Sequence, residues 1–70
     1  MKTIPVNSSD LHAAGYDNTH KIMQIEFNNG GIYLYYDVPE HIYRSLLSAH
    51  SHGKYFHAYI KDVYRYKRIH

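Results

Sequence analysis

The stretch KIMQIEFNNGGIYLYYDV, residues 21–38, decides the fold of this 70-residue chain. In its first part three apolar residues alternate with polar ones, which predicts a half-buried strand over residues 21–27. Residues 28–31 contain an Asn-Gly pair, and such a pair tolerates the positive φ that tight hairpin turns need. The pattern therefore predicts an antiparallel hairpin whose return strand covers residues 32–38.

The loop of this hairpin determines which side of the return strand faces the core. A loop of two or four residues would place Leu34 and its neighbours two positions away on the same face as Phe27. A bulged loop would instead place Tyr33 and Tyr35 on that face. The sequence leaves both alternatives open.

The segments around the hairpin predict an α+β domain. Short extended pieces are expected at residues 4–6 and 11–16, before the hairpin. After it the apolar spacing becomes helical, which predicts helices over residues 40–49 and 53–63, and an extended tail over residues 64–69. We expect an antiparallel meander of three to four strands followed by two short helices packed on one sheet face. The predicted core consists of Met23, Ile25, Phe27, Leu46, Leu47, Phe56 and Ile60.

Length and composition limit the classes of protein that this chain can belong to. Seventy residues suit one domain, spanning residues 1–70, and a domain this small is marginally stable. The chain has no Cys, so disulfides cannot supplement its core, and we expect it to form a homo-oligomer. The absence of Cys, of a signal peptide and of a long apolar run predicts a cytoplasmic protein that does not contact a membrane.

Tyrosine is the dominant residue type, with nine copies and no Trp. Near the C-terminus, tyrosines alternate with basic residues over residues 61–68, in KDVYRYKR. Aromatic rings stack on nucleobases, while Lys and Arg neutralise phosphates. Although most single tyrosines are expected in the core, this segment favours a nucleic-acid partner. The net charge of +2 adds little to that argument, which depends on the local clustering of basic residues.

The turn before the second predicted helix has two interpretations. A helix N-terminus offers unpaired N–H groups, Gly53 allows close approach of a ligand, and Lys54 adds a positive charge, so the turn could receive an anion. In the simpler interpretation, Ser51 caps the helix and Gly53 makes the interhelical turn.

The sequence carries no catalytic motif and no convincing metal site. His50, His52 and His57 are close in sequence, but no Cys is present to complete a zinc site. Neither a nucleophile elbow nor a metalloprotease signature occurs. We therefore expect a protein that is not an enzyme and that needs no metal or cofactor.

Several short motifs together resemble a known family. In order along the chain they are Val6-Asn7-Ser8-Ser9, Gly15-Tyr16-Asp17, Met23-x-Ile25-x-Phe27, Gly30-x-x-Tyr33-x-Tyr35, Val38-Pro39 and Ala49-x-Ser51-x-Gly53-x-Tyr55-Phe56. Over residues 6–69 this pattern resembles the KTSC domain, named for the C-terminus of some lysyl-tRNA synthetases and also found as a stand-alone protein. The resemblance implies an RNA-binding module, because of the family's company with a tRNA enzyme.

Three functional hypotheses follow. The first is a binding module for RNA or single-stranded nucleic acid, and the second is a homo-oligomeric sponge that sequesters a small phosphorylated nucleotide signal, as a phage anti-defence protein would. The third is a protein–protein adaptor. The candidate ligand-binding residues are Tyr33, Tyr35, Arg44, Ser51, Gly53, Lys54, Tyr55, His57, Lys61, Tyr64, Arg65, Tyr66 and Arg68.

Overall fold

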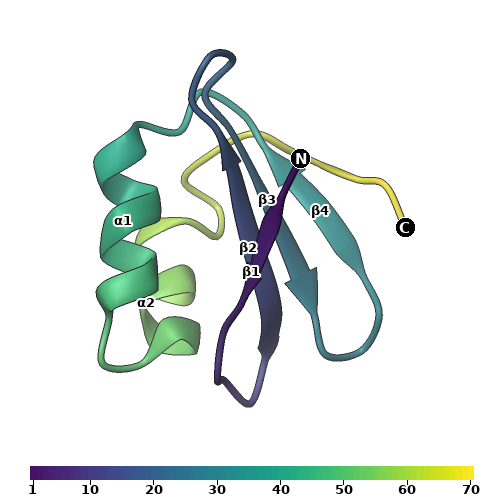
Figure 1. The fold of residues 1–70 in the computed structure, drawn as a ribbon, viewed down its shortest axis with the longest axis vertical. Helices are drawn as coiled ribbons and strands as arrows, with labels where there is room; N and C mark the ends of the chain where they lie inside the picture. The colour runs from purple at the N-terminus through teal and green to yellow at the C-terminus, as the bar shows by residue number, and fades with distance from the viewer.

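The computed structural model describes residues 1–70 and has one five-stranded antiparallel sheet with two helices. The strands are β1 (Thr3–Pro5), β2 (Leu11–Asp17), β3 (Ile22–Phe27), β4 (Ile32–Tyr35) and β5 (Tyr66–Arg68), and they are neighbours in the order of their numbers. The helices α1 (Glu40–Ser48) and α2 (His52–Tyr59) follow β4 and lie together on one side of the sheet (Figure 1). This confirms the predicted α+β class, with one strand more than expected.

The β3–β4 hairpin turns through a three-residue loop that ends in a bulge. The Phe27 N–H donates to the Gly31 carbonyl over 2.8 Å, and the Gly30 N–H donates to the Phe27 carbonyl over 2.9 Å. Gly30 has a φ of 94°, which a glycine adopts without steric cost. The resulting register pairs Ile25 with Tyr33, so the two side chains lie on the same face. The bulged-loop alternative is therefore confirmed.

The core lies between the sheet and the two helices. Its fully or nearly fully buried members are Leu11, Ala14, Met23, Ile25, Tyr35, Val38, Leu46, Phe56 and Ile60. Five of the seven predicted core residues belong to this set. The other two, Phe27 and Leu47, are half-buried and pack against it. The alternation in β3 and the apolar stripe on each helix thus select the right faces.

Two predicted ends were wrong, and the predicted tail has an additional pairing. Helix α2 ends at Tyr59 rather than at residue 63, because the chain then turns through Asp62, whose φ of 63° is left-handed. The return strand ends at Tyr35 rather than at residue 38, since Asp37 has a φ of 57°. The tail is extended as predicted, but it also pairs with β4 and becomes an edge strand of the sheet.

Strand β1 lies unusually close to β2 at Gly15. A Cβ atom added to Gly15 would come within 2.6 Å of the Lys2 carbonyl oxygen, a distance that real Cβ atoms do not show. Thr3 pairs with Gly15 at this point, so the glycine permits the close approach of the N-terminal strand. Neither helix has the length and apolar character that crossing a membrane requires.

Candidate functional site

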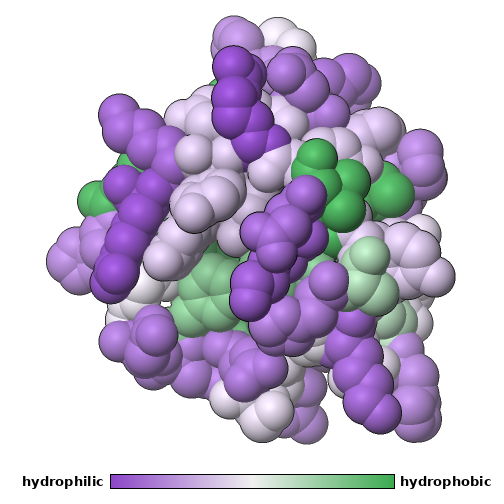
Figure 2. Space-filling model, turned by 180° about the vertical axis from the view of Figure 1, so that it is seen from behind, coloured by the Kyte–Doolittle hydropathy of each residue, from purple (hydrophilic) through white to green (hydrophobic).

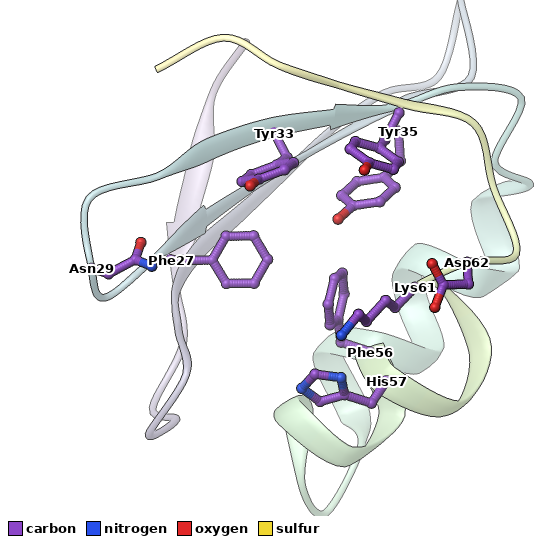
Figure 3. Close-up of a pocket in the computed structure, with 9 residues that line it drawn as sticks. Phe27, Asn29, Tyr33, Tyr35, Phe56, His57, Lys61 and Asp62 are labelled. Atoms are coloured by element: carbon purple, nitrogen blue, oxygen red, sulfur yellow. The ribbon is translucent and has the colours of Figure 1, made fainter.

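An open cleft of about 270 Å³ lies between the β4–β5 side of the sheet and helix α2. Figure 3 shows Tyr33 and Tyr35 extending from the sheet, with Phe56 and His57 of α2 facing them and Lys61 and Asp62 just beyond the helix. We call this feature the aromatic cleft. It is lined by Phe27, Asn29, Tyr33, Tyr35, Phe56, His57, Lys61, Asp62 and Tyr66.

The rings of the aromatic cleft contact one another and form a continuous apolar wall. The centroids of Tyr33 and Tyr35 are 6.4 Å apart with the ring planes 21° from parallel, and Tyr66 lies 5.7 Å from Tyr33 and 5.9 Å from Tyr35. Phe56 meets Phe27 edge-on at 5.3 Å. Tyr66 is 56% exposed, so much of its ring is accessible to a ligand.

The hydroxyl groups of these tyrosines have no partner within the protein. Tyr33, Tyr35 and Tyr66 donate no hydrogen bond to another residue. Every fully buried side-chain oxygen in the structure does have a hydrogen-bond partner. The Tyr35 oxygen therefore keeps some accessible surface, although the residue as a whole is only 4% exposed. Burial raises the pKa of this hydroxyl, and nearby Tyr33, Tyr66 and Asp62 add to the effect. The group is thus a neutral donor at physiological pH.

The charges around the aromatic cleft are divided between its interior and its rim. Lys61 and Asp62 line it together, with opposite charges and no ion-pair partner in the chain. Arg68 pairs with Tyr33 across β4 and β5, and its guanidinium lies 5.7 Å from the Tyr33 ring centroid. The neighbouring Lys67 pairs with Leu34 and so belongs to the opposite face of the sheet. The interior is close to neutral, and Arg68 supplies positive charge beside it.

The predicted binding residues separate into those at the aromatic cleft and those elsewhere. Tyr33, Tyr35, His57, Lys61 and Tyr66 line the cleft, and Arg68 is stacked beside them.

Besides the three residues of the turn before α2, four predicted residues lie away from the cleft. Arg65 is over the Tyr36 ring at 5.2 Å and near Asp37, on the opposite sheet face. Arg44 is paired with Glu40 on α1, Tyr55 packs against Tyr59 at 4.7 Å, and Tyr64 is half-buried against the core.

Sequence reasoning missed four residues that line the cleft. Phe27 and Phe56 were expected only in the core, although the alternation in β3 already placed Phe27 on the inner face. Asn29 was noted only as part of the turn, and Asp62 only as one residue of the basic segment. No local pattern marks these two, because the fold brings them to the cleft from distant parts of the chain.

The turn before α2 lies at a separate polar hollow of about 430 Å³, shared with residues 7–10. The Ser51 hydroxyl accepts a hydrogen bond from the Lys54 N–H over 3.3 Å, which confirms the predicted N-cap. A Cβ atom on Gly53 would lie 3.2 Å from an Asp10 carboxylate oxygen. The chain thus places its own carboxylate at this helix N-terminus, and an incoming anion would meet that negative charge.

The histidines near this turn have separate surroundings. His52 Nδ1 lies 2.7 Å from the Leu46 carbonyl oxygen and so connects the two helices, while His57 Nε2 is 3.8 Å from Asp10 Oδ2. No group of three or more His, Cys, Asp or Glu side chains is placed to hold a metal ion.

Comparison with known proteins identifies the family. The model of the KTSC domain matches residues 7–66, and the chain belongs to this family. A protein of Stutzerimonas stutzeri is 40% identical over 70 residues, which cover 99% of both chains. A crystal structure of a KTSC domain protein from Yersinia pestis superposes with a TM-score of 0.96 at 33% identity, covering 99% of this chain and 97% of that chain.

A similar segment also occurs within a much larger enzyme. The lysine–tRNA ligase of Nostoc sp. is 36% identical over 61 residues, which cover 87% of this chain but only 11% of the ligase. The resemblance stated from the sequence motifs is thereby confirmed, together with its link to lysyl-tRNA synthetases.

Proposed function

We propose that this protein binds single-stranded nucleic acid, most naturally RNA, and holds one base in the aromatic cleft. The observation that supports this best is the wall of rings, with Tyr66 exposed at its edge and Arg68 beside it on the same face. Proteins that bind single strands combine such stacking surfaces with cations that follow the backbone. The cleft supplies the first element and the β5 tail supplies the second.

The charge distribution assigns the two parts of a nucleotide to different places. Lys61 and Asp62 offset each other inside the cleft, which therefore suits a neutral, planar group better than a phosphate. Arg68, which has no ion-pair partner, lies beside the rings and suits the backbone. A base in the cleft with its phosphate toward Arg68 uses both features.

The size of the cleft also favours a single base. Pockets for whole small molecules usually measure about 300–1,000 Å³, and this one measures about 270 Å³. It is open on one side, so the remainder of a longer ligand can continue over the surface. The occurrence of a similar segment in lysine–tRNA ligases adds support, since those enzymes act on an RNA.

Fluorescence anisotropy with a labelled single-stranded RNA of about eight nucleotides tests the proposal, because single-strand site sizes fall near that length. Arg68→Ala should weaken binding and lower the slope of log affinity against log salt by about 0.7. Lys67→Ala is the matched control, since it removes the same charge from the same strand but on the other face. Equal losses from both variants, or no binding at low salt, would contradict the proposal.

A small-nucleotide sponge is the second candidate. Tyr66 of the cleft is 56% exposed and Val63, which follows Asp62 in the chain, is 61% exposed, so a second copy of the chain docked over them would cover the cleft. However, the cleft is lined by Asn29, His57, Lys61 and Asp62 as well as by rings, whereas stable interfaces have an apolar centre. On the face shown in Figure 2, too, green apolar side chains are interrupted by purple hydrophilic ones. Two results together would favour the sponge: a mononucleotide binds as tightly as the oligonucleotide, and native mass spectrometry shows that the protein binds it as a dimer.

A further inference from the structure

We propose that the aromatic cleft selects guanine among the four bases and that Asp62 is the residue that determines this specificity. The inference rests on the proposed function, since it presumes that a base occupies the cleft. It arises from the polar side chains that line the cleft beside the aromatic rings.

Three of these polar groups have hydrogen-bonding capacity that the chain leaves unused. The Asp62 carboxylate and the Lys61 ammonium have no hydrogen-bond or ion-pair partner in the protein. The Asn29 side-chain oxygen accepts from the Gly31 N–H over 2.8 Å, which fixes its orientation and leaves its amide NH₂ free. Figure 3 shows Asn29 at one end of the cleft and Lys61 and Asp62 at the other, with the rings between them.

This set of groups is complementary to one base. A carboxylate accepts hydrogen bonds and has no proton to give at neutral pH. Guanine presents two adjacent donors, the ring N1–H and the exocyclic N2–H₂, and it has acceptors at O6 and N7 for an ammonium or an amide. Adenine and cytosine place a ring-nitrogen acceptor beside their single amino group, and uracil flanks its one N–H with two carbonyls. Each of those three bases would direct a lone pair toward the Asp62 carboxylate.

The backbone of the fold does not require a carboxylate at position 62. Its φ of 63° lies in the left-handed region, which Asn and Gly also adopt readily. The turn itself is held by main-chain bonds, because the Ile60 and Lys61 N–H groups both donate to the Phe56 carbonyl, over 3.0 and 2.9 Å. Asp62 also acts on the cleft electrostatically, as one of the groups that raise the pKa of Tyr35.

The test uses oligouridine strands of about eight nucleotides that carry guanosine, adenosine, cytidine or inosine at one central position. For the wild-type protein the guanosine strand should bind at least about tenfold more tightly than the adenosine strand, as one bidentate base contact gives. The inosine strand, which lacks the 2-amino group, should fall between them.

Two variants then assign the preference to a residue. Asp62→Gly keeps the left-handed backbone and removes the carboxylate, so the preference for guanosine should disappear while the melting temperature stays close to wild type. Asp37→Gly is the matched control, since Asp37 is an exposed aspartate with a φ of 57° that does not line the cleft. It removes the same charge and should keep the preference. Asp62→Asn, which keeps one acceptor, should reduce the preference less than Asp62→Gly.

The outcomes distinguish this inference from the proposed function. Equal affinity for all four strands would overturn guanine selection and leave nucleic-acid binding standing. A guanosine preference that survives in Asp62→Gly would overturn the role of Asp62. No binding to any strand would overturn the proposed function and this inference together.

Discussion

Two groups of tyrosines in this molecule both have stacked rings but differ in the hydrogen bonds of their hydroxyl groups. Tyr16 and Tyr43 stack at 5.2 Å with planes 14° apart, and their hydroxyls donate to the carbonyls of Val38 and Ala14. In the aromatic cleft the rings stack as well, yet their hydroxyls have no protein partner. Tyr35 is more buried than either member of the first pair, which is only half-buried. The two groups therefore differ in whether the hydroxyl has a protein partner, and not in a greater burial of the structural pair.

The largest expected effect is on the stability of the fold, and it comes from Phe56, which belongs to both the core and the lining of the cleft. Phe56 is 3% exposed and contacts both Phe27 and Tyr35, so Phe56→Ala removes a ring from the core and from the cleft wall together. We expect a loss of about 3–5 kcal/mol in the free energy of unfolding, close to the total stability of so small a domain. Urea denaturation followed by circular dichroism measures it. A loss below about 1 kcal/mol would show that the Phe56 ring is not part of the core.

The sequence predicted the hairpin, both helices and most of the core because these features depend on short-range patterns. Alternation in β3, the Asn-Gly turn and the stripe on α1 are each readable within a dozen residues. The pairing of β5 was not predicted, since its three residues show no apolar alternation and its partner β4 is far away in the chain. The edge strand exists because tertiary contacts bring the tail back to the sheet.

The candidate site was predicted in its residue types but not in its grouping. Rings and cations are recognisable by type, and of those selected as ligand-binding, Tyr33, Tyr35, Tyr66 and Lys61 line one cleft, whereas Tyr55 and Tyr64 do not. Arg65 was selected for the same reason, but strand alternation in the tail directs it to the other face, over Tyr36. Asn29 and Asp62 became visible only when the fold placed the hairpin loop opposite the end of α2. These two residues matter because the fold brings them to the same cleft, and no local sequence pattern predicts that.

The next largest effect is on the affinity for RNA, and it tests whether the exposed Tyr66 ring of the cleft binds a base. Tyr66→Ala should weaken binding of a single-stranded RNA by about 1–3 kcal/mol, the usual contribution of one base–aromatic stack. Its stability should change little, because the ring is 56% exposed. Tyr59→Ala is the control, since Tyr59 is also 56% exposed but does not line the cleft. If both variants lose affinity equally, the aromatic cleft is not where the base binds.

A smaller effect should follow from removing single hydroxyl groups. Tyr16→Phe leaves the Val38 carbonyl without its donor, and we expect a loss of about 1–2 kcal/mol in the free energy of unfolding. Tyr35→Phe removes no hydrogen bond within the protein and should change stability by less than about 0.5 kcal/mol. The two variants are compared by urea denaturation at neutral pH. A Tyr35→Phe protein as unstable as Tyr16→Phe would remove the distinction between the two groups of tyrosines.

The smallest effect is a dependence of stability on alkaline pH. Burial raises the pKa of Tyr35, Tyr16 and Tyr43 in the folded protein above the ordinary value of 10.0. On raising the pH, the unfolded chain therefore loses these protons first, so the stability they contribute is fully present below about pH 10 and declines above it.

Tyr35→Phe removes one of the three groups, and its stability should decline less steeply than that of the wild type between about pH 9 and pH 11. Urea midpoints measured across this range, with the two proteins matched at neutral pH, give the comparison. Parallel curves would mean that the Tyr35 hydroxyl ionises as easily in the folded protein as in the unfolded chain. The cleft would then be wetter around this oxygen than the packing of Tyr35 against Phe56, Tyr33 and Tyr66 indicates.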